Sequence, residues 1–353
     1  MYRIYSFKTV IRYILLFVVI GYSHSVVAQQ DSLVNSGSQL QKAKILSDSG
    51  KYELAIKELK RIDPRDTNYV AALSRLTDVY LATGDYREVI KTTEEGLSQT
   101  SSNRSDFLVS QGMAYTQLGE YEKASDVFDL GINEFPFYPA FVLQKGKMYY
   151  AQKKYDEAEK FFFQGLEVSP FNSISHLHLA IISMLRGEKV RGMMAMGLYL
   201  SVNNQNNKQL VSLERFVKNQ ITDEGTISPS ELNSFARLDG IIRSRLAMES
   251  VYKHRIPIDA GIVRQYQLLF DQLALQQYNS PDPWVKFYLP VYQEMMKNNV
   301  QEAFVYHILQ SSSIKEVPEW AKKNKAAIEK FYGVVNTSMK KWREKKTLPQ
   351  MGY

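Results

Sequence analysis

Short turns recur through the first half of the chain at an almost constant interval. Each turn precedes a tyrosine, and successive tyrosines lie 34, 35 and 34 residues apart, at Tyr52, Tyr86, Tyr121 and Tyr155. Self-similarity at this period is typical of stacked supersecondary units, each of which contacts mainly its neighbours. The spacing therefore predicts an array of helical hairpins rather than a single globular core.

Positions on both sides of each turn carry residues of matching size. Before the turn, a small residue is followed three positions later by a large one, as at Gly112 and Tyr115. After the turn, another small residue is followed four positions later by a large one, as at Ala124 and Phe128. Because antiparallel helices approach closely only where facing residues are small, we expect Gly112 to lie against Ala124, with the equivalent contact in the next unit.

The turns themselves carry the residues that end helices. Glycine, which adopts a left-handed cap without strain, stands two positions before three of the repeat tyrosines, at Gly50, Gly84 and Gly119. Lys153 occupies the fourth position, so we expect a poorer cap there. Pro136 and Pro170 close the third and fourth units, because proline cannot donate the intrahelical hydrogen bond.

The pattern Gly-x-x-Tyr, then Leu-Gly-x-Tyr-x-x-Ala-x-x-x-Phe and a closing Pro, resembles the tetratricopeptide repeat (TPR) family. The resemblance covers about residues 36–204 and implies an all-α solenoid of about five hairpins. The expected repeats span residues 36–69, 70–104, 105–138, 139–172 and 173–204. In the fifth repeat Lys189 replaces the tyrosine and Gly192 the alanine, so we expect a divergent or capping unit.

Residues 205–353 lose the period but remain helical in pattern, and we expect a C-terminal all-helical module. A serine, a proline and an acid at Ser228–Glu231 resemble a capping box and predict a helix to about Lys253. Asp282 and Pro283 predict another helix start before Trp284. The sequence leaves open whether this module extends the solenoid or forms a separate domain.

The last predicted helix is amphipathic and basic. Its apolar residues recur at spacings of three and four, at Ile328, Phe331, Val335, Met339 and Trp342. Residues 315–353 hold ten Lys or Arg against four Asp or Glu. This basic face is either a solvated surface or a contact for an acidic partner or an anionic membrane surface. Nucleic acid is not favoured, because a reader of nucleic acid is expected to carry a basic stripe across its main domain.

The first residues have the pattern of a secretory signal peptide. Arg3, Lys8 and Arg12 precede an apolar run of about ten residues, and Ala28 completes a small-residue cleavage site. We therefore expect residues 1–28 to be removed and residues 29–35 to form a short linker. The chain has no cysteine, which excludes disulfides. We expect an exported protein in the periplasm or on the extracellular face of a bacterial envelope.

Motifs for catalysis, metals and cofactors are missing. His176 and His178 lie two apart on a predicted helix, which turns their side chains about 200° from one another, so they cannot chelate one metal ion. No phosphate loop, dinucleotide fingerprint, nucleophile elbow or zinc-protease motif occurs. We expect no catalytic residues, no metal and no cofactor, and therefore a non-enzymatic chain.

The remaining candidate for function is the concave groove that a TPR array forms from the first helix of each unit. Counting from the small residue of each unit, the inward positions of the groove include Asp78, Met113, Gln117, Leu143, Lys147, Tyr150, Leu177 and Ile181. TPR domains that clamp a terminal carboxylate place Lys and Asn at several such positions. Only Lys147 fits here, so we do not expect that ligand class.

These observations favour a scaffold or adaptor that binds a protein or peptide partner in envelope assembly, transport or secretion. The alternative is a structural solenoid whose groove is occupied by its own C-terminal module. The sequence names no partner, process or oligomeric state.

Overall fold

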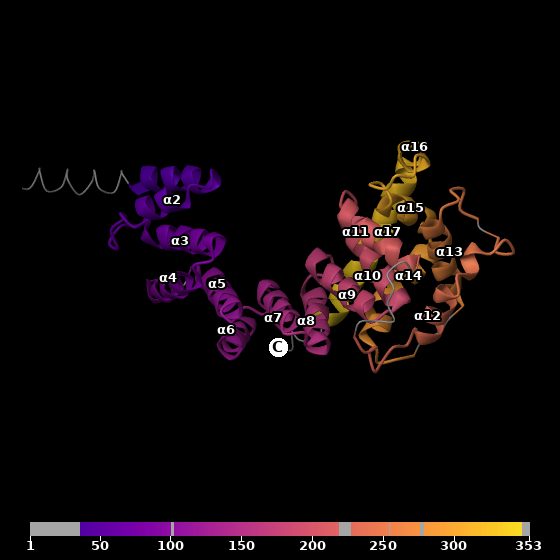
Figure 1. Cartoon of the computed structure of the whole chain (residues 1–353), viewed down its shortest axis with the longest axis horizontal. Helices are drawn as coiled ribbons and strands as arrows, with labels where there is room; N and C mark the ends of the chain where they lie inside the picture. Colours follow the sequence, from indigo (N-terminus) through magenta and orange to yellow (C-terminus); the bar gives the residue numbers. More distant parts are fainter. Residues whose placement is uncertain (1–35, 100–101, 219–226, 254, 276–278, 348–353) are drawn as a thin grey trace, which may run out of the picture. The chain divides into compact units, whose positions relative to one another are not determined.

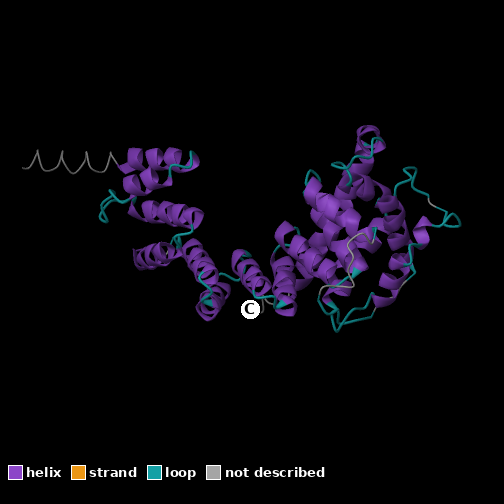
Figure 2. Cartoon of the chain, in the orientation of Figure 1, coloured by secondary structure: helices purple, strands orange, loops and turns teal. Residues whose placement is uncertain are grey.

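The computed structural model describes residues 36–99, 102–218, 227–253, 255–275 and 279–347. Within these ranges the chain consists of helices and connecting loops, and no strand occurs (Figure 2). The expected all-α class is therefore confirmed. The expected signal peptide and linker, residues 1–35, lie outside the described residues. The chain divides into two compact units, residues 1–135 and 136–353 (Figure 1).

The first unit is a series of antiparallel helical hairpins. A helix over residues 36–48 is followed by α2 (Tyr52–Leu59), α3 (Tyr69–Thr83), α4 (Tyr86–Gln99), α5 (Arg104–Gln117) and α6 (Tyr121–Glu134). Each helix from α2 to α6 packs against the next. The buried faces of the helices up to α5 form one core that includes Leu59, Leu73, Tyr80, Val89 and Phe107. The 34-residue period thus corresponds to one hairpin.

The turns adopt the backbone conformation that the sequence predicts. Gly50, Gly84 and Gly119 have positive φ values of 72°, 81° and 76°. Lys153 adopts the same left-handed conformation at φ 59°, although its Cβ makes that conformation unfavourable. The fourth turn therefore keeps the left-handed conformation of the other turns, although lysine disfavours that conformation.

The helix contact inside a repeat differs in detail from the expected one. A Cβ placed on Gly112 would lie 2.3 Å from Cε1 of Phe128, and the three nearest side-chain atoms all belong to that ring. The glycine therefore makes room for the phenylalanine ring, rather than for Ala124 as expected. Gly146 stands in the same relation to Phe162, at 2.9 Å. Ala124 itself is fully buried.

The second unit begins with two further hairpins. The first consists of α7 (Ala140–Ala151) and α8 (Tyr155–Val168), and the second of α9 (Ser173–Leu185) and α10 (Lys189–Val202). Helix α10 is apolar around most of its circumference, and all its residues up to Ser201 are buried. A helix of this kind needs cover on every side. That cover cannot come from the repeats alone.

The helices after residue 205 supply it. They are α11 (Asn207–Val217), α12 (Ala236–Arg243), a short 3-10 helix (Leu246–Met248), α13 (Gly261–Ala274), α14 (Pro283–Lys297), α15 (Gln301–Ile308), α16 (Glu316–Lys323) and α17 (Lys325–Thr347). Helix α10 contacts α11, α12, α14 and α15 (Figure 1). One continuous core runs from Leu143 to Met339. The boundary between the two compact units thus lies within the repeats, after residue 135. The sequence instead predicts a boundary near residue 205, where the repeat period is lost.

The helix expected from Ser228 to about Lys253 is wrong at both ends, because α12 spans only Ala236–Arg243. The backbone N–H of Ser230 donates to Oε1 of Glu188 at 2.8 Å, and the carbonyl of Leu232 accepts from Arg191. These long-range contacts hold the segment as a loop. The helix start at Asp282 is confirmed, since its carboxylate accepts from the N–H of Trp284 at 3.0 Å.

The apolar stripe of the last helix is also confirmed. Phe331, Val335 and Met339 are buried, and α17 packs on α14 and α15. The lysines of α17 lie on the other side, where Lys330 and Lys340 are exposed. The basic residues therefore surround a helix whose apolar face is already in contact with the protein.

Candidate functional site

The expected groove residues fall into both compact units. In the first unit, Asp78 on α3 is exposed and lies 3.8 Å from the guanidinium of Arg75. Met113 on α5 is half-buried and Gln117 is exposed. These three residues are at least partly exposed.

In the second unit, the expected residues lie on two neighbouring first helices. Leu143, Lys147 and Tyr150 follow one another at helical spacing on α7, and Leu177 and Ile181 do so on α9. Leu143 is buried, and a Cβ placed on Gly165 would lie 2.9 Å from its Cδ2, so Leu143 belongs to the core. The other four are half-buried. They occupy the border between core and surface.

His178 joins these residues, although sequence reasoning misses it. Its ring packs edge-on against Tyr150, with centroids 5.5 Å apart, and stacks on Phe162 at 4.6 Å. The repeat register predicts that Leu177, and not His178, faces the concave groove. The sequence signal that could have identified His178 is the pair of aromatic residues Tyr150 and Phe162, whose rings offer flat surfaces for its imidazole. We call Lys147, Tyr150, Leu177, His178 and Ile181 the α7–α9 face.

The protonation of His178 follows from its contacts. Nδ1 lies 2.8 Å from the carbonyl oxygen of Ile174, which can only accept, so Nδ1 carries the proton and Nε2 a lone pair. Burial lowers the pKa of His178, the bond to Ile174 opposes this, and the nearby Lys147 ammonium lowers the pKa further. The imidazole is therefore neutral near pH 7 and presents Nε2 as an acceptor.

Three polar groups of the α7–α9 face have no protein partner. Among the described residues, no hydrogen bond or ion pair engages Nζ of Lys147, the hydroxyl of Tyr150 or Nε2 of His178. Burial lowers the pKa of Lys147, and no neighbouring carboxylate opposes the effect. None of these three atoms is among the fully buried polar atoms that lack a partner, so each is open to solvent. Convergent unpaired polar groups beside apolar side chains are typical of a binding face.

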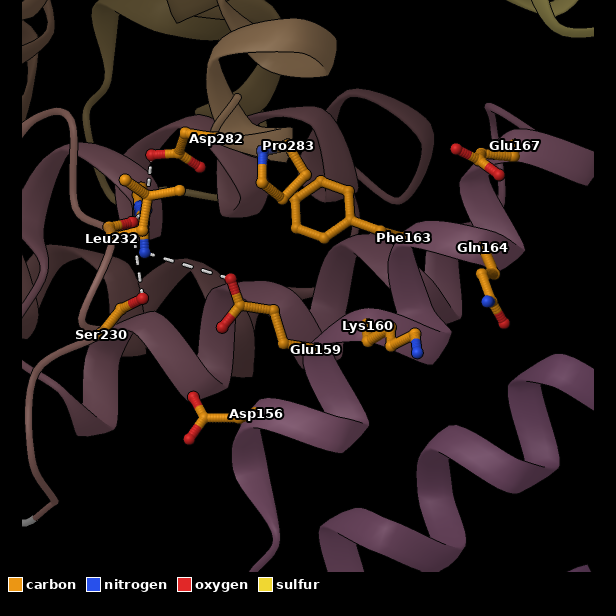
Figure 3. Close-up of a pocket in the computed structure, with 11 residues that line it drawn as sticks. Asp156, Glu159, Lys160, Phe163, Gln164, Glu167, Ser230, Leu232, Asp282 and Pro283 are labelled. Carbon is orange, nitrogen blue, oxygen red and sulfur yellow. Dashed lines mark hydrogen bonds and ion pairs between the residues drawn. The ribbon is translucent and has the colours of Figure 1, made fainter. Parts of the chain in front are cut away.

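A separate pocket of about 400 Å³ lies between α8, the loop before α12 and the start of α14 (Figure 3). It is lined by Asp156, Glu159, Lys160, Phe163, Gln164, Glu167, Arg191, Ser230, Leu232, Asp282 and Pro283. In Figure 3, Glu159 and Asp282 lie at one end, while Gln164 and Glu167 lie further along α8. The polar groups that line this pocket could bind a ligand, so their contacts decide whether it is a candidate site.

Those polar groups are already engaged with one another. Arg191 donates to Asp282 at 2.7 Å and to Glu188 at 3.1 Å, and lies 4.0 Å from Glu159. Arg186 donates to Glu159 as well, and the indole N–H of Trp284 donates to its other oxygen. We call this network the Arg191 junction.

The Arg191 junction fixes the helices after residue 205 to the repeats. Glu159 comes from α8, Arg191 from α10, and Asp282 caps α14. Because each carboxylate in it accepts from a buried cation or an N–H, no acid at this end of the pocket is left for a ligand. The pocket is therefore a structural junction, and the α7–α9 face is the better candidate for function.

Two further observations concern only the described residues. No group of three or more histidine, aspartate and glutamate side chains is arranged among them as a metal site. None of the described helices is both long enough and apolar enough to span a bilayer.

Comparison with known proteins identifies the repeat family in part of the chain. A tetratricopeptide repeat model matches residues 105–136 and 141–172, which confirms the resemblance for the third and fourth units. A crystal structure of MamA is 16% identical over 51% of this chain and 97% of its own, with a TM-score of 0.37. A tetratricopeptide repeat protein from Parabacteroides merdae is 16% identical over 86% of this chain and 98% of its own, with a TM-score of 0.40. No curated protein matches the chain.

Proposed function

We propose that this tetratricopeptide repeat chain is a non-enzymatic scaffold that binds a protein or peptide partner on the α7–α9 face. The observation that carries the proposal is the set of unpaired polar groups on Lys147, Tyr150 and His178. They lie beside Leu177 and Ile181, which are only half-buried. A face of this composition can hold an apolar side chain and orient it by hydrogen bonds.

The chemistry of the α7–α9 face supports binding rather than catalysis. His178 uses Nδ1 on a backbone carbonyl, and among the described residues no carboxylate orients its ring as in a catalytic triad. Lys147 has a pKa lowered by burial and lies near His178, but no carboxylate among the described residues joins these two groups in an acid–base site. Recognition of a partner is the simpler use of these groups.

The alternative is that the C-terminal module fills the groove and the solenoid is purely structural. Tyr150, Leu177 and Met184 pack against the core that the module shares, which is the observation in favour of this alternative. However, the ring contacts of Tyr150 and His178 stay within the repeats, with Tyr155 and Phe162. The module contacts α10, and it also reaches α8 through α17 and α9 through the bond between Tyr288 and His176. The polar groups of Lys147, Tyr150 and His178 take no part in these contacts, which supports the binding proposal.

The location of this function is also a proposal. Residues 1–28 have the composition of a signal peptide, and we place the scaffold in the envelope of a bacterium, in assembly, transport or secretion. N-terminal sequencing of protein isolated from the envelope tests the location. The first residue should be Gln29 or lie within a few positions of it. A first residue of Met1 in that fraction would contradict export by cleavage.

Crosslinking pull-down from the native envelope tests the binding proposal. The double variant Tyr150→Ala, Ile181→Ala removes the rim of the α7–α9 face, and Leu275→Ala is the control, because Leu275 is an exposed aliphatic residue elsewhere in the second unit. We expect the double variant to lose specific partners while its melting temperature stays close to that of the control. Retained partners would contradict the proposal. A large fall in melting temperature would favour the structural alternative.

A further inference from the structure

Exposed aromatic side chains gather in two loops of the second unit. In the loop before α7, Phe137 is 70% exposed and Tyr138 39%, and in the loop before α9, Phe171 is 40% exposed. Of the large exposed aromatic side chains among the described residues, only Tyr332 lies elsewhere. Phe137 and Phe171 each follow a proline and are 34 residues apart, which is one repeat period. They therefore occupy equivalent positions on one edge of neighbouring hairpins.

The end of α17 lies beside the second of these loops. The ring of Trp342 packs edge-on against Phe287, with centroids 5.1 Å apart, and Phe287 lies 5.9 Å from the ring of His176. Nε2 of His176 bonds to the carbonyl of Pro170, the residue directly before Phe171, at 2.9 Å. Helix α17 also contacts α8, which ends just before this loop (Figure 1). The residues around Trp342 are thus two ring contacts away from the loop.

This end of α17 is strongly basic. Residues 340–346 hold five Lys or Arg against one Glu. Lys340 and Lys341 are exposed, and the one acid, Glu344, lies 3.9 Å from Lys340. The apolar face of α17 is already packed on α14 and α15, so it is not available to a second surface. The helix can therefore contribute charge to a further contact, but not apolar area.

An aromatic edge beside a basic helix end matches the surface of an anionic bilayer. Phenylalanine side chains of peripheral proteins enter the boundary between lipid headgroups and acyl chains, and clustered lysines are attracted to anionic lipids. Stable attachment takes two signals, and here the loops supply the apolar signal and α17 the electrostatic one. A protein partner would need a pocket for each projecting ring, whereas a bilayer accepts rings at any position along the edge.

We propose that the loops before α7 and α9 and the end of α17 together form a peripheral contact with an anionic lipid bilayer. Phe137 and Phe171 enter the headgroup region, and Lys340 and Lys341 face the lipid phosphates. We call these four residues the lipid edge. The lipid edge shares no residue with the α7–α9 face, so it adds a membrane contact to the proposed binding of a protein partner.

Co-sedimentation with sucrose-loaded vesicles tests the lipid edge. The protein is the chain from Gln29 onward, which keeps every described helix and lacks the N-terminal apolar run that would itself enter lipid. One set of vesicles contains phosphatidylcholine with about one third phosphatidylglycerol, and the other phosphatidylcholine alone. We expect binding to the anionic vesicles only. The binding should weaken at least about tenfold between roughly 0.05 and 0.5 M NaCl, because salt screens the attraction.

Two double variants separate the two signals. Phe137→Ser with Phe171→Ser removes the rings, and Lys340→Gln with Lys341→Gln removes two charges. Each pair should weaken binding to anionic vesicles at least about tenfold. The lysine pair should also reduce the salt dependence, whereas the phenylalanine pair should retain it. If the phenylalanine pair lowers the melting temperature, the single variant Phe137→Ser, at the more exposed ring, gives the same comparison.

The matched controls change exposed residues elsewhere in the second unit. Val251→Ser with Leu275→Ser is the control for the rings, because both side chains are 76% exposed. Lys208→Gln with Lys218→Gln is the control for the charges, because both lysines are exposed. Both control pairs should bind anionic vesicles as the native chain does.

Several results would overturn the lipid edge. They are an absence of binding to anionic vesicles, equal binding to neutral ones, or equal losses in the variants and their controls. A photoreactive benzophenone amino acid at Phe171 should crosslink to lipid in the native envelope. Capture of a discrete protein at this position instead would show that the edge is a protein interface. None of these results bears on the α7–α9 face, which has its own test.

Discussion

The hydroxyl of Tyr288 donates a hydrogen bond to Nδ1 of His176 at 2.8 Å, and this bond joins α14 to α9. On the other side of the ring, Nε2–H donates to the carbonyl of Pro170 at 2.9 Å. Both ring nitrogens are thus occupied when the imidazole is neutral, and its side chain is buried at 1% exposure. A second proton on Nδ1 would break the bond to Tyr288 and leave a charge in the core.

The stability of the second unit should therefore fall in mild acid. Burial lowers the pKa of His176 to about 4 in the fold, whereas an unfolded histidine titrates near 6.5. The unfolded state takes up a proton first as the pH falls, so the full stability is present above about 6.5. It is lost progressively toward pH 4, by at most about 1.4 kcal/mol per pH unit for one group.

Urea unfolding at pH 7.5, 6.0 and 5.0 measures this loss. His176→Gln keeps a polar side chain without a titrating group, so its free energy of unfolding should depend less on pH than that of the native chain. His178 and His307, whose pKa values are also lowered by burial, contribute equally to both proteins. Equal pH dependence in the two proteins would show that His176 is not held neutral by the fold.

Two glycines in helices should respond to alanine with opposite sign. A Cβ on Gly146 would lie 2.9 Å from the ring of Phe162, which is fully buried, whereas a Cβ on Gly333 meets nothing within 4 Å. Overpacking should make Gly146→Ala less stable by about 1–3 kcal/mol. Gly333→Ala should be more stable by up to about 1 kcal/mol, because alanine has the better helix propensity.

Both glycines belong to the second unit, so thermal or urea unfolding of the same transition compares them directly. Stabilisation by both changes would mean that the repeat register around Gly146 is incorrect. The same test in the first unit uses Gly112→Ala, where the distance to Phe128 is shorter still at 2.3 Å.

Replacing Lys153 by glycine should stabilise the fourth repeat. Lys153 adopts φ 59°, a conformation that costs an L-residue roughly 1–2 kcal/mol and glycine almost nothing. Part of the gain is offset by the greater backbone entropy of glycine in the unfolded chain. We expect a net increase of about 0.5–1 kcal/mol in the free energy of unfolding. A decrease would indicate that the lysine side chain contributes contacts that outweigh the strain.

Removing the cation of the Arg191 junction should be strongly destabilising. Arg191→Met leaves Asp282 and Glu188 buried with one partner fewer, and breaking a buried pair of this kind typically costs about 3–5 kcal/mol. The matched control is Arg255→Met, whose pair with Asp271 is largely exposed and should contribute less than about 1 kcal/mol. Equal effects would mean that Arg191 does not fix α14 to the repeats.

The repeat architecture could be predicted because its determinants are local and recur. Gly84, Tyr86 and Val89 lie within one turn and the following helix, and the next unit repeats their spacing. The strain at Lys153 was predictable for the same reason, since three glycines mark its conformation. The stripe of Phe331, Val335 and Met339 likewise depends only on helical periodicity.

The Arg191 junction could not be predicted, because its partners are far apart in sequence. Arg191 and Asp282 are 91 residues apart, and Trp284 and Glu159 are 125 apart. The one local signal is the charge of Arg191 within an otherwise apolar helix, which requires a buried partner without naming it. The same junction explains why the predicted helix start at Ser228–Glu231 is wrong. The backbone N–H of Ser230 bonds to Glu188, and this contact replaces the local capping pattern.

Sequence periodicity could only partly distinguish residues that face the groove from residues that are buried in the core. Periodicity places Leu143 and Lys147 on one face of α7, but it cannot show that Leu143 is covered by the packing around Gly165 while Lys147 stays unpaired. His178 reaches the same face by stacking on Phe162 of another hairpin. Contacts of this kind between neighbouring hairpins decide which inward residues a partner can reach.

Site-specific photocrosslinking in the native envelope tests the central claim most directly. A photoreactive benzophenone amino acid is placed at Ile181 on the α7–α9 face, or at Lys160 on α8 beside the pocket of the Arg191 junction. We predict a discrete crosslinked partner from position 181 and none from position 160. A partner captured at position 160 and not at 181 would contradict the assignment of the binding face.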